Sequence, residues 1–388
     1  MGHGSEQPAT AGRALRLEAG LGHVVLAGLE GDERAEVVQA WSRCAPTTEP
    51  AGSATVPDAR RAPDGTGSWK GFHEQLVHTA TTAAIEAGRG THLMFHAACL
   101  ADPDSGAGVV LAAASGTGKT TATRTLGRHY AYLTDETAII APEDLTITPF
   151  PKPLSLLGAD GRRPKRQAGP DELGLGPTRG ATLRCIAVLD RVREPEGDVT
   201  ARSEPMPLAD ALTELVPQTS SLSRLPRGLV TLCRTLDRLG GARRLVYAEA
   251  ADLRPVVDEL LAAEPVPQAP TWEALEEAEL AASSERAELA EGGEPAEGGA
   301  PEGPVRLRRR AADCGVHLED GRVALLVDQQ LIVLGGLGPS LWLLLDEPRT
   351  AEELLAALTA EGDAPADARA LLDEAVRALR AEGVLKIQ

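Results

Sequence analysis

The sequence predicts an α/β domain with a glycine-rich loop, followed by a small, separate α+β domain. Short apolar runs such as GVVLAAA and LRCIAVLD have the length and composition of buried strands, and they alternate with helical segments. The loop AASGTGKT follows one such strand and precedes a helix. A Glu/Ala/Gly/Pro-rich stretch then separates this part from the C-terminal residues.

Composition shifts along the chain predict its domain organisation. An N-terminal α/β extension covers residues 1–92, with a Pro/Ala/Gly/Thr-rich, disordered insertion at 45–68. The α/β domain itself covers 93–263, an acidic linker covers 264–304, and the small domain covers 305–388. The first half of the linker lacks an apolar stripe, so a solitary exposed helix is the structure expected for it.

Both ends of the chain have recognisable local signals. Near the N-terminus we expect disorder over residues 1–13, a strand at 24–27 and helices at 31–43 and 69–87. In the small domain, Thr350 and Glu353 have the spacing of a capping box. The other elements expected there are strands at 323–327 and 331–334, a short helix at 341–346, helices at 351–360 and 366–382, and an apolar run at 384–387.

Charge and cysteine content indicate which binding partners and which cellular compartment are expected for the protein. The net charge is −18, and half of it lies between residues 265 and 304, which contain ten Glu and one Arg. The remaining acidity argues against a nucleic-acid partner. No run reaches the roughly 18 apolar residues of a membrane span, and no secretory signal is present. Five scattered cysteines form no CxxC pair, so a reducing cytoplasm without disulfides or zinc is expected.

The loop at residues 113–120 has the pattern of a phosphate-binding loop, in which backbone N–H groups and the start of the next helix surround the β- and γ-phosphates of ATP. Lys119 supplies a positive charge, and the hydroxyl of Thr120 is a ligand for Mg²⁺. Ala113 stands where the consensus has glycine. The predicted phosphate-binding residues are Ser115, Gly116, Thr117, Gly118, Lys119 and Thr120.

Two further features lie near this loop in the sequence. Asp135 and Glu136 follow an apolar strand and come sixteen and seventeen residues after Lys119. Carboxylates in that place can hold Mg²⁺ or accept a hydroxyl proton, although a polar turn between strands would also explain them. His96 interrupts the apolar run LMFHAACL. A single histidine on an apolar strand is more often a core residue than a catalytic one.

The order FHAACL, ASGTGKTT, YLTDETAII and PFPKPLSL resembles the HPr kinase family and its relatives in peptide natural-product pathways. The resemblance implies a P-loop fold of the HPr kinase/phosphoenolpyruvate carboxykinase type that uses ATP and Mg²⁺. It implies Asp135 as the base, with Glu136 assisting at Mg²⁺, and His96 near the reacting groups. Lys152, in the FPKP segment, matches a recurrent lysine that reaches phosphate, or else it belongs to a proline-bracketed turn. A homo-oligomer is also favoured by this resemblance.

Three departures from the bacterial HPr kinases are visible. Glu136 replaces the second aspartate, Ala114 replaces an acidic residue, and the later glycine-rich segment that serves phosphorolysis has no counterpart. The resemblance therefore implies a one-way kinase, and it does not imply HPr as the substrate.

Residues 305–388 resemble the PqqD-like family, known as RiPP recognition elements, in the order of a strand pair, a Gly-x-x-hydrophobic-Trp turn, an Arg-Thr helix start and a final GVL. The resemblance implies a winged-helix fold that binds the leader of a precursor peptide as an added strand. The implied strand edge consists of Gln330, Leu331, Ile332, Val333 and Leu334, and the implied helix face of Leu372, Val376 and Leu379. A DNA-binding winged helix is the competing interpretation, but the region carries fourteen acidic against ten basic residues and no basic stripe.

These features lead to three functional hypotheses. The first is a cytoplasmic, ATP-dependent kinase that phosphorylates a Ser or Thr hydroxyl of a ribosomally made precursor peptide. The second is a regulatory P-loop ATPase whose C-terminal winged helix binds DNA or protein. The third is a small-molecule kinase that uses the C-terminal domain for interactions.

Overall fold

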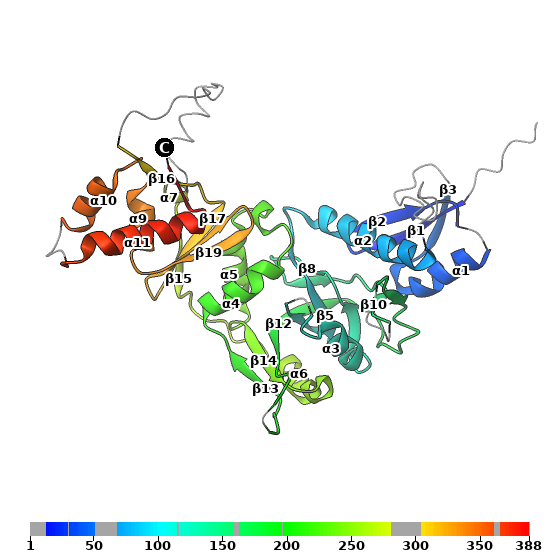
Figure 1. Ribbon diagram of the computed structural model, residues 1–388. Helices are drawn as coiled ribbons and strands as arrows, with labels where there is room; N and C mark the ends of the chain where they lie inside the picture. Colours follow the sequence, from blue (N-terminus) through cyan, green and yellow to red (C-terminus); the bar gives the residue numbers. More distant parts are fainter. Residues whose placement is uncertain are drawn as a thin grey trace, which may run out of the picture. The chain divides into compact units, whose positions relative to one another are not determined.

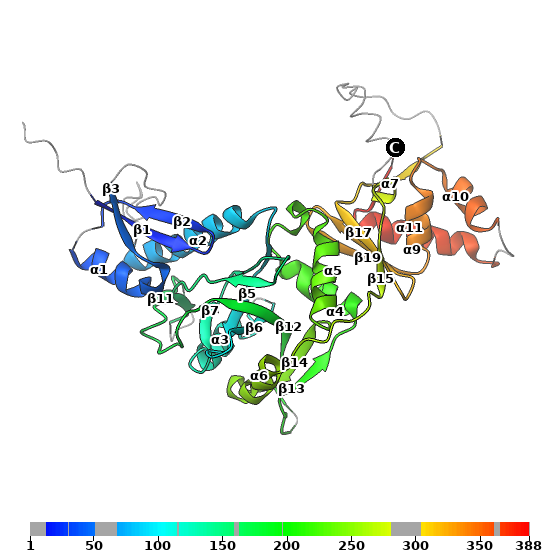
Figure 2. The same cartoon turned by 180° about the vertical axis from the view of Figure 1, so that it is seen from behind.

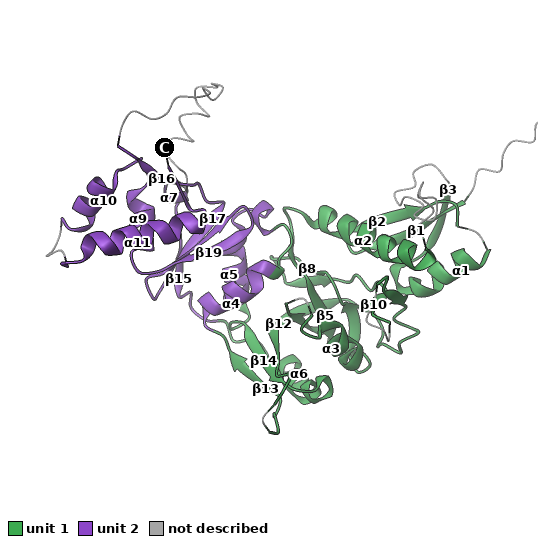
Figure 3. Ribbon diagram, viewed as in Figure 1, with its two compact units in different colours: residues 1–206, 218–221, 238–267 green, residues 207–217, 222–237, 268–388 purple. Residues whose placement is uncertain are grey.

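The structure is a computed structural model of the 388-residue chain. It describes residues 13–29, 31–50, 68–114, 116–158, 163–195, 197–280, 304–360 and 365–387. The chain divides into two compact units (Figure 3). Unit 1 comprises residues 1–206, 218–221 and 238–267, and unit 2 comprises residues 207–217, 222–237 and 268–388. Disorder was predicted for residues 1–13 and 45–68; of these, residues 1–12 and 51–67 lie outside the described residues, and Arg13 is the first residue of a strand.

Unit 1 begins with an antiparallel three-stranded sheet, in the order β2-β1-β3, against which two helices pack. The strands are β1 (Arg13–Ala19), β2 (Gly22–Leu26) and β3 (Thr47–Pro50), and the helices are α1 (Gly31–Ala40) and α2 (Trp69–Gly88). The side chain of Ser68 caps α2 by accepting a hydrogen bond from the N–H of Gly71. The disorder predicted for the insertion is wrong for its first residues, because β3 pairs with β1.

A nine-stranded mixed sheet forms the centre of unit 1 (Figures 1 and 2). Its path is β4-β8-β9-β12-β6-β5-β7, with β14 beside β12 and β13 beside β14. The long strand β12 is parallel to both β6 and β14, and the other pairs are antiparallel. The strands are β4 (Leu93–Phe95), β5 (Ala97–Ala101), β6 (Ala107–Ala112), β7 (Ala131–Thr134), β8 (Ala138–Ile140), β9 (Thr146–Thr148), β12 (Ala181–Arg191), β13 (Arg202–Pro205) and β14 (Arg243–Tyr247).

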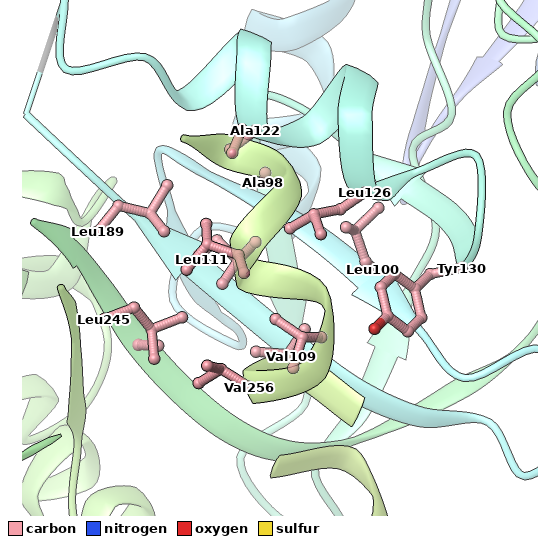
Figure 4. Packing of buried hydrophobic residues seen from close by; sticks show 14 of the residues in the cluster. Ala98, Leu100, Val109, Leu111, Ala122, Leu126, Tyr130, Leu189, Leu245 and Val256 are labelled. Carbon is pink, nitrogen blue, oxygen red and sulfur yellow. The ribbon is translucent and has the colours of Figure 1, made fainter. Parts of the chain in front are cut away.

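Two helices, α3 (Lys119–Leu126) and α6 (Leu253–Ala262), share one hydrophobic core with strands of this sheet. In Figure 4, Leu126 from α3 and Val256 from α6 lie among Leu100, Val109 and Leu111 of the strands. A two-stranded hairpin, β10 (Leu154–Leu156) and β11 (Arg166–Ala168), contacts α3 through β10 and α2 through β11. These contacts place the hairpin beside the beginning of α3, where the glycine-rich loop ends.

The predicted strands of unit 1 are confirmed, and two of the runs turn out to be split. LMFHAACL breaks at His96 into β4, which pairs with β8, and β5, which pairs with β6 and β7. The N–H of His96 donates instead to the carbonyl of Gln218, at 2.6 Å. The histidine therefore lies at a point where the chain changes its neighbours in the sheet.

Unit 2 contains a four-stranded antiparallel sheet in the order β15-β17-β18-β19, a two-stranded pair β16–β20, and several helices (Figure 1). The strands are β15 (Trp272–Ala274), β16 (Leu307–Arg309), β17 (Cys314–Leu318), β18 (Val323–Val327), β19 (Gln330–Leu334) and β20 (Leu385–Ile387). The helices are α4 (Leu208–Leu215), most of α5 (Gly228–Arg238), α7 (Glu277–Leu280), α9 (Gly338–Leu344), α10 (Ala351–Leu358) and α11 (Ala368–Ala381). The capping box of Thr350 and Glu353 is confirmed.

The solitary helix predicted for the segment that starts at Trp272 is wrong for its first residues. Trp272–Ala274 forms β15 and pairs with β17. Leu275 is 2% exposed and belongs to the core of unit 2, and the indole N–H of Trp272 donates to Asp237 at 2.9 Å. Periodicity did not reveal this because only two large apolar side chains anchor a segment that is otherwise rich in Glu and Ala. Residues 281–303 of the predicted linker lie outside the described residues.

Candidate active site

The glycine-rich loop connects β6 to α3, as predicted. β6 is parallel to β12, so the loop leaves the carboxyl end of a parallel strand, where α/β proteins bind ligands. Gly116 and Gly118 have φ values of 82° and 100°, which only glycine adopts without strain. The hydroxyl of Thr117 donates to the carbonyl of Ala114 at 2.7 Å and closes the loop. Ser115 lies outside the described residues.

A cleft of about 880 Å³ opens beside this loop within unit 1. It brings together residues that are far apart in the sequence, namely the glycine-rich loop, the histidine between β4 and β5, and the acidic pair after β7. Its predicted members are His96, Gly116, Gly118, Lys119, Thr120, Asp135 and Glu136. The predicted proximity of these groups is therefore present in the folded chain.

The turn that follows β7 fixes the position of the acidic pair, Asp135 and Glu136. The hydroxyl of Thr134 accepts hydrogen bonds from the N–H groups of Glu136 and Thr137, at 3.2 and 3.3 Å. β7 pairs with β5, so the turn lies beside the start of the strand that follows His96. The carboxylate of Asp135 is almost fully enclosed, whereas that of Glu136 is 28% exposed.

Lys152 holds both carboxylates from inside the protein. Its side chain is 0% exposed, and its ammonium group lies 2.7 Å from Oδ1 of Asp135, 2.9 Å from Oε2 of Glu136 and 3.0 Å from the carbonyl of Pro153. The hydroxyl of Tyr132 lies 3.1 Å from the same Oδ1 of Asp135. The prediction that Lys152 reaches phosphate is therefore wrong, because its three N–H donors are used and the side chain does not line the cleft.

The charges of this cluster do not cancel. Burial alone would lower the pKa of Lys152, but the two carboxylates raise it above its ordinary value, so the group is a cation. Burial would raise the pKa of Glu136, yet the attraction and hydrogen bond of Lys152 bring the net pKa below its usual range. One cation between two anions leaves one negative charge, and it faces the cleft.

Lys119 and His96 line the same cleft as this charge. The ammonium group of Lys119 donates to the backbone carbonyl of His96 at 2.9 Å. Burial lowers the pKa of Lys119 to about 8, against the attraction of Asp135 and Glu136. Burial and the neighbouring Lys119 also lower the pKa of His96, so its imidazole is neutral at pH 7. The imidazole makes no hydrogen bond within the described part of the chain.

Oxygen donors suited to Mg²⁺ line the same cleft. Oδ2 of Asp135 and Oε1 of Glu136 make no hydrogen bonds within the described residues, and Thr120 lies at the start of α3. Among those residues no group of three or more His, Cys, Asp and Glu forms a metal cluster. That donor set fits Mg²⁺, which usually binds one or two carboxylates together with substrate phosphates.

Sequence reasoning missed one wall and one rim of the cleft. The wall is a face of α2, with Gly71, Glu74, Gln75, Val77 and His78, and the rim is the β10–β11 hairpin with its loop, including Ser155, Leu156, Leu157, Arg163 and Lys165. The polar positions of the helix at 69–87 were the available signal. Periodicity does not distinguish a polar face that meets solvent from one that lines a cleft.

The strand predicted to bind a peptide is β19, and its edge orientation follows from the preceding turn. Asp328 and Gln329 both have positive φ and form a two-residue hairpin turn, so Val327 and Gln330 are a hydrogen-bonded pair. Hydrogen-bonded and non-bonded pairs alternate in an antiparallel ladder. The N–H groups of Gln330, Ile332 and Leu334 therefore point to β18, and those of Leu331 and Val333 point outward.

No strand pairs with the outer edge of β19 in the described part of the chain, and helix α4 contacts this strand. The predicted helix face is wrong for two of its three residues. Leu372 and Leu379 are buried in the core of unit 2, and only Val376 is partly exposed. Leu371, at 42% exposed, is the larger apolar side chain that α11 presents to its surroundings. The winged-helix assignment stays a prediction.

Among the described residues, no helix combines the length and the apolar character that a membrane span requires. The predicted cytoplasmic location, homo-oligomer and absence of a nucleic-acid partner stay predictions.

Comparisons with known proteins agree with the C-terminal resemblance. Residues 317–385 match the family model described as coenzyme PQQ synthesis protein D (PqqD). No curated protein sequence matches the chain. Among solved structures, the HPr(Ser) kinase/phosphatase from Coxiella burnetii is similar over 43% of this chain and 93% of its own, at 13% identity and a TM-score of 0.23. The chain thus carries a PqqD domain at residues 317–385.

Proposed function

We propose that the protein is an ATP-dependent kinase that phosphorylates a Ser or Thr hydroxyl of a ribosomally made precursor peptide, whose leader binds the PqqD domain. One observation carries the proposal. A phosphate loop and a lysine-held pair of carboxylates line one cleft, in a chain that also carries a PqqD domain. The chain thus combines two features. One is a cleft that can bind a phosphate donor and supply a general base, and the other is a segment that resembles peptide-binding modules.

The glycine-rich loop would bind the phosphates of ATP. Its backbone N–H groups and the N-terminus of α3 attract anions, and Lys119 lies at the first position of that helix. The carbonyl of His96 keeps the ammonium group of Lys119 directed into the cleft at 2.9 Å. Mg²⁺, held by Thr120 and Glu136, would supply charge neutralisation at the phosphates.

Asp135 is suited to accept the proton of the acceptor hydroxyl. Its Oδ1 is held by Lys152 and Tyr132, so Oδ2 is fixed in direction and free to bind a hydroxyl. The hydroxyl oxygen attacks the terminal phosphorus, its proton passes to Oδ2, and the bond from phosphorus to the bridging oxygen breaks. ADP leaves with that electron pair. The neutral imidazole of His96 lies beside the same groups and can donate or accept a hydrogen bond there.

The peptide would pair with the outer edge of β19 through Leu331 and Val333, whose N–H groups point away from β18. An added strand of this kind gains affinity from main-chain hydrogen bonds and specificity from alternate side chains. Capture of the leader raises the local concentration of the acceptor segment near the cleft.

The test is incubation of the full chain with MgATP and each precursor peptide encoded beside its gene, followed by intact-mass analysis of the peptides. We expect one peptide to gain a phosphoryl group and to gain none with Lys119→Ala. Hydrolysis of ATP without any modified peptide would favour the regulatory ATPase, and phosphorylation of a metabolite alone would favour a small-molecule kinase.

A further inference from the structure

Basic side chains line the candidate cleft beyond the phosphate loop. They are Arg124 on α3, and Arg163 and Lys165 in the loop of the β10–β11 hairpin. Arg163 pairs with Glu74 of α2 at 2.9 Å. Lys165 is half-buried and makes no ion pair with the described part of the chain. The next residue, Arg166, is exposed and pairs with Glu172, away from the cleft.

The backbone of Lys165 is held in place by the hairpin. Lys165 immediately precedes β11, whose first residue Arg166 is paired with Leu156 of β10. The side-chain amide of Gln167 donates to the carbonyl of Lys165 at 3.4 Å, and Ser155 donates to the same amide group at 2.7 Å. Ser155 also lines the cleft. The lysine therefore extends from an anchored position on the rim.

Lys165 lines the same cleft as the phosphate-loop lysine, Lys119, and comes from a different element. Lys152 is neutralised by Asp135 and Glu136, whereas Lys165 has no carboxylate partner in the described residues. Two cations from different elements that repel each other across a cleft form a site for a polyanion, because a bound anion removes the repulsion.

We propose that Lys165 binds an oxygen of the terminal phosphate of the nucleoside triphosphate, from the hairpin rim outside the phosphate loop. The terminal phosphate is the one indicated because the ammonium group of Lys119 lies at the carbonyl of His96, beside the acidic pair where phosphoryl transfer is proposed. The phosphate that contacts both Lys119 and Lys165 is therefore the terminal one. The inference deepens the proposed function and rests on it for the use of a nucleoside triphosphate and for the place of phosphoryl transfer.

The discriminating probes are ADP and a non-hydrolysable ATP analogue, both with Mg²⁺, because they differ in the terminal phosphate. Lys165→Met should weaken binding of the analogue by about 10- to 150-fold, the range for a lost charge-assisted hydrogen bond, and should change the affinity for ADP by less than about 3-fold. Lys165→Arg keeps the charge and should restore most of the affinity. Calorimetry on the full chain gives both dissociation constants.

Arg166→Met is the matched control, since it removes a neighbouring cation that points away from the cleft, and it should affect neither ligand. Equal loss of ADP and analogue binding in Lys165→Met, or no loss of either, would overturn the proposal. So would an unchanged analogue affinity with a raised KM for the peptide, which would assign Lys165 to the acceptor. The comparison needs no peptide turnover, so a failure to phosphorylate any peptide leaves its outcome readable.

Discussion

The ammonium group of Lys152 lies 2.7 Å from Oδ1 of Asp135, and both side chains are almost completely removed from solvent. Glu136 shares the same cation at 2.9 Å. This arrangement places one buried cation between two adjacent carboxylates, which would repel each other if the lysine were absent. It also fixes Asp135 so that one oxygen stays available to an acceptor.

Lys152→Met should therefore destabilise the protein and abolish transfer. Breaking a buried ion pair by removing one partner costs about 3–5 kcal/mol, because the remaining charge is buried without compensation. Denaturant unfolding of the variant measures this loss. Adding Asp135→Asn to Lys152→Met should recover part of it, and a double variant that loses the sum of both single effects would contradict the pairing.

Nucleotide binding should weaken as pH rises through about 8, the lowered pKa of Lys119. Below this pH the free protein holds a protonated Lys119 that attracts phosphate, and above it the proton must be taken up on binding. The stability of the folded chain changes with pH in the opposite direction to nucleotide binding. The lysine is harder to protonate in the folded chain, so its contribution to stability rises between pH 8 and its ordinary value of 10.5.

Calorimetric titration of MgADP from pH 7 to 9.5 tests this pH dependence. Lys119→Arg keeps its charge over that range and should show a flat profile. A flat profile in the unmodified protein would contradict a lysine that loses its proton near pH 8.

Asp135→Asn should reduce turnover by two or more orders of magnitude while leaving the affinity for MgATP within about 3-fold, if Asp135 accepts the hydroxyl proton. Glu136→Gln should instead raise the Mg²⁺ concentration needed for half-maximal rate. Rate measurements over a Mg²⁺ series separate the two roles. Rescue of Asp135→Asn by high Mg²⁺ would show that the roles are exchanged.

The sequence was sufficient to predict that the glycine-rich loop connects a strand to a helix and that it lies close to the acidic pair. The glycines of this loop are required by backbone geometry, as the positive φ values of Gly116 and Gly118 show. The sequence identified Lys152 in the FPKP segment as a candidate site residue, but it did not predict that Lys152 binds the two carboxylates. Sequence alone does not reveal whether a lysine side chain points into a cleft or into the core. The strand at Trp272 escaped detection for a related reason, since its partner β17 lies more than forty residues away in the sequence.

The buried side chains of α11 show what hydrophobic periodicity does not predict. Leu372 and Leu379 have helical spacing on one face of α11, which identifies an apolar face correctly. That face packs on the domain's own core. An apolar stripe on a helix predicts that this face is buried. Whether the domain's own core or a bound peptide buries it depends on tertiary packing.

Leu331→Pro should weaken precursor binding by at least about 10-fold, because it removes one outward N–H of β19 and leaves the ladder to β18 intact. Leu331→Val keeps the N–H and is the matched control. Fluorescence anisotropy with a labelled precursor peptide measures the affinity, and thermal melting confirms that the variant is folded. Equal affinities of the two variants would place the peptide elsewhere.

The proposed function requires one chain to capture a peptide in unit 2 and to phosphorylate it in the cleft of unit 1. The deciding measurement is kcat/KM for phosphoryl transfer from MgATP to the full precursor peptide, compared with the same peptide without its leader. Tethering predicts a value about 10²-fold higher for the full precursor. Leu331→Pro should reduce that advantage. Equal values of kcat/KM for the two peptides would show that capture of the leader does not deliver the substrate to the cleft.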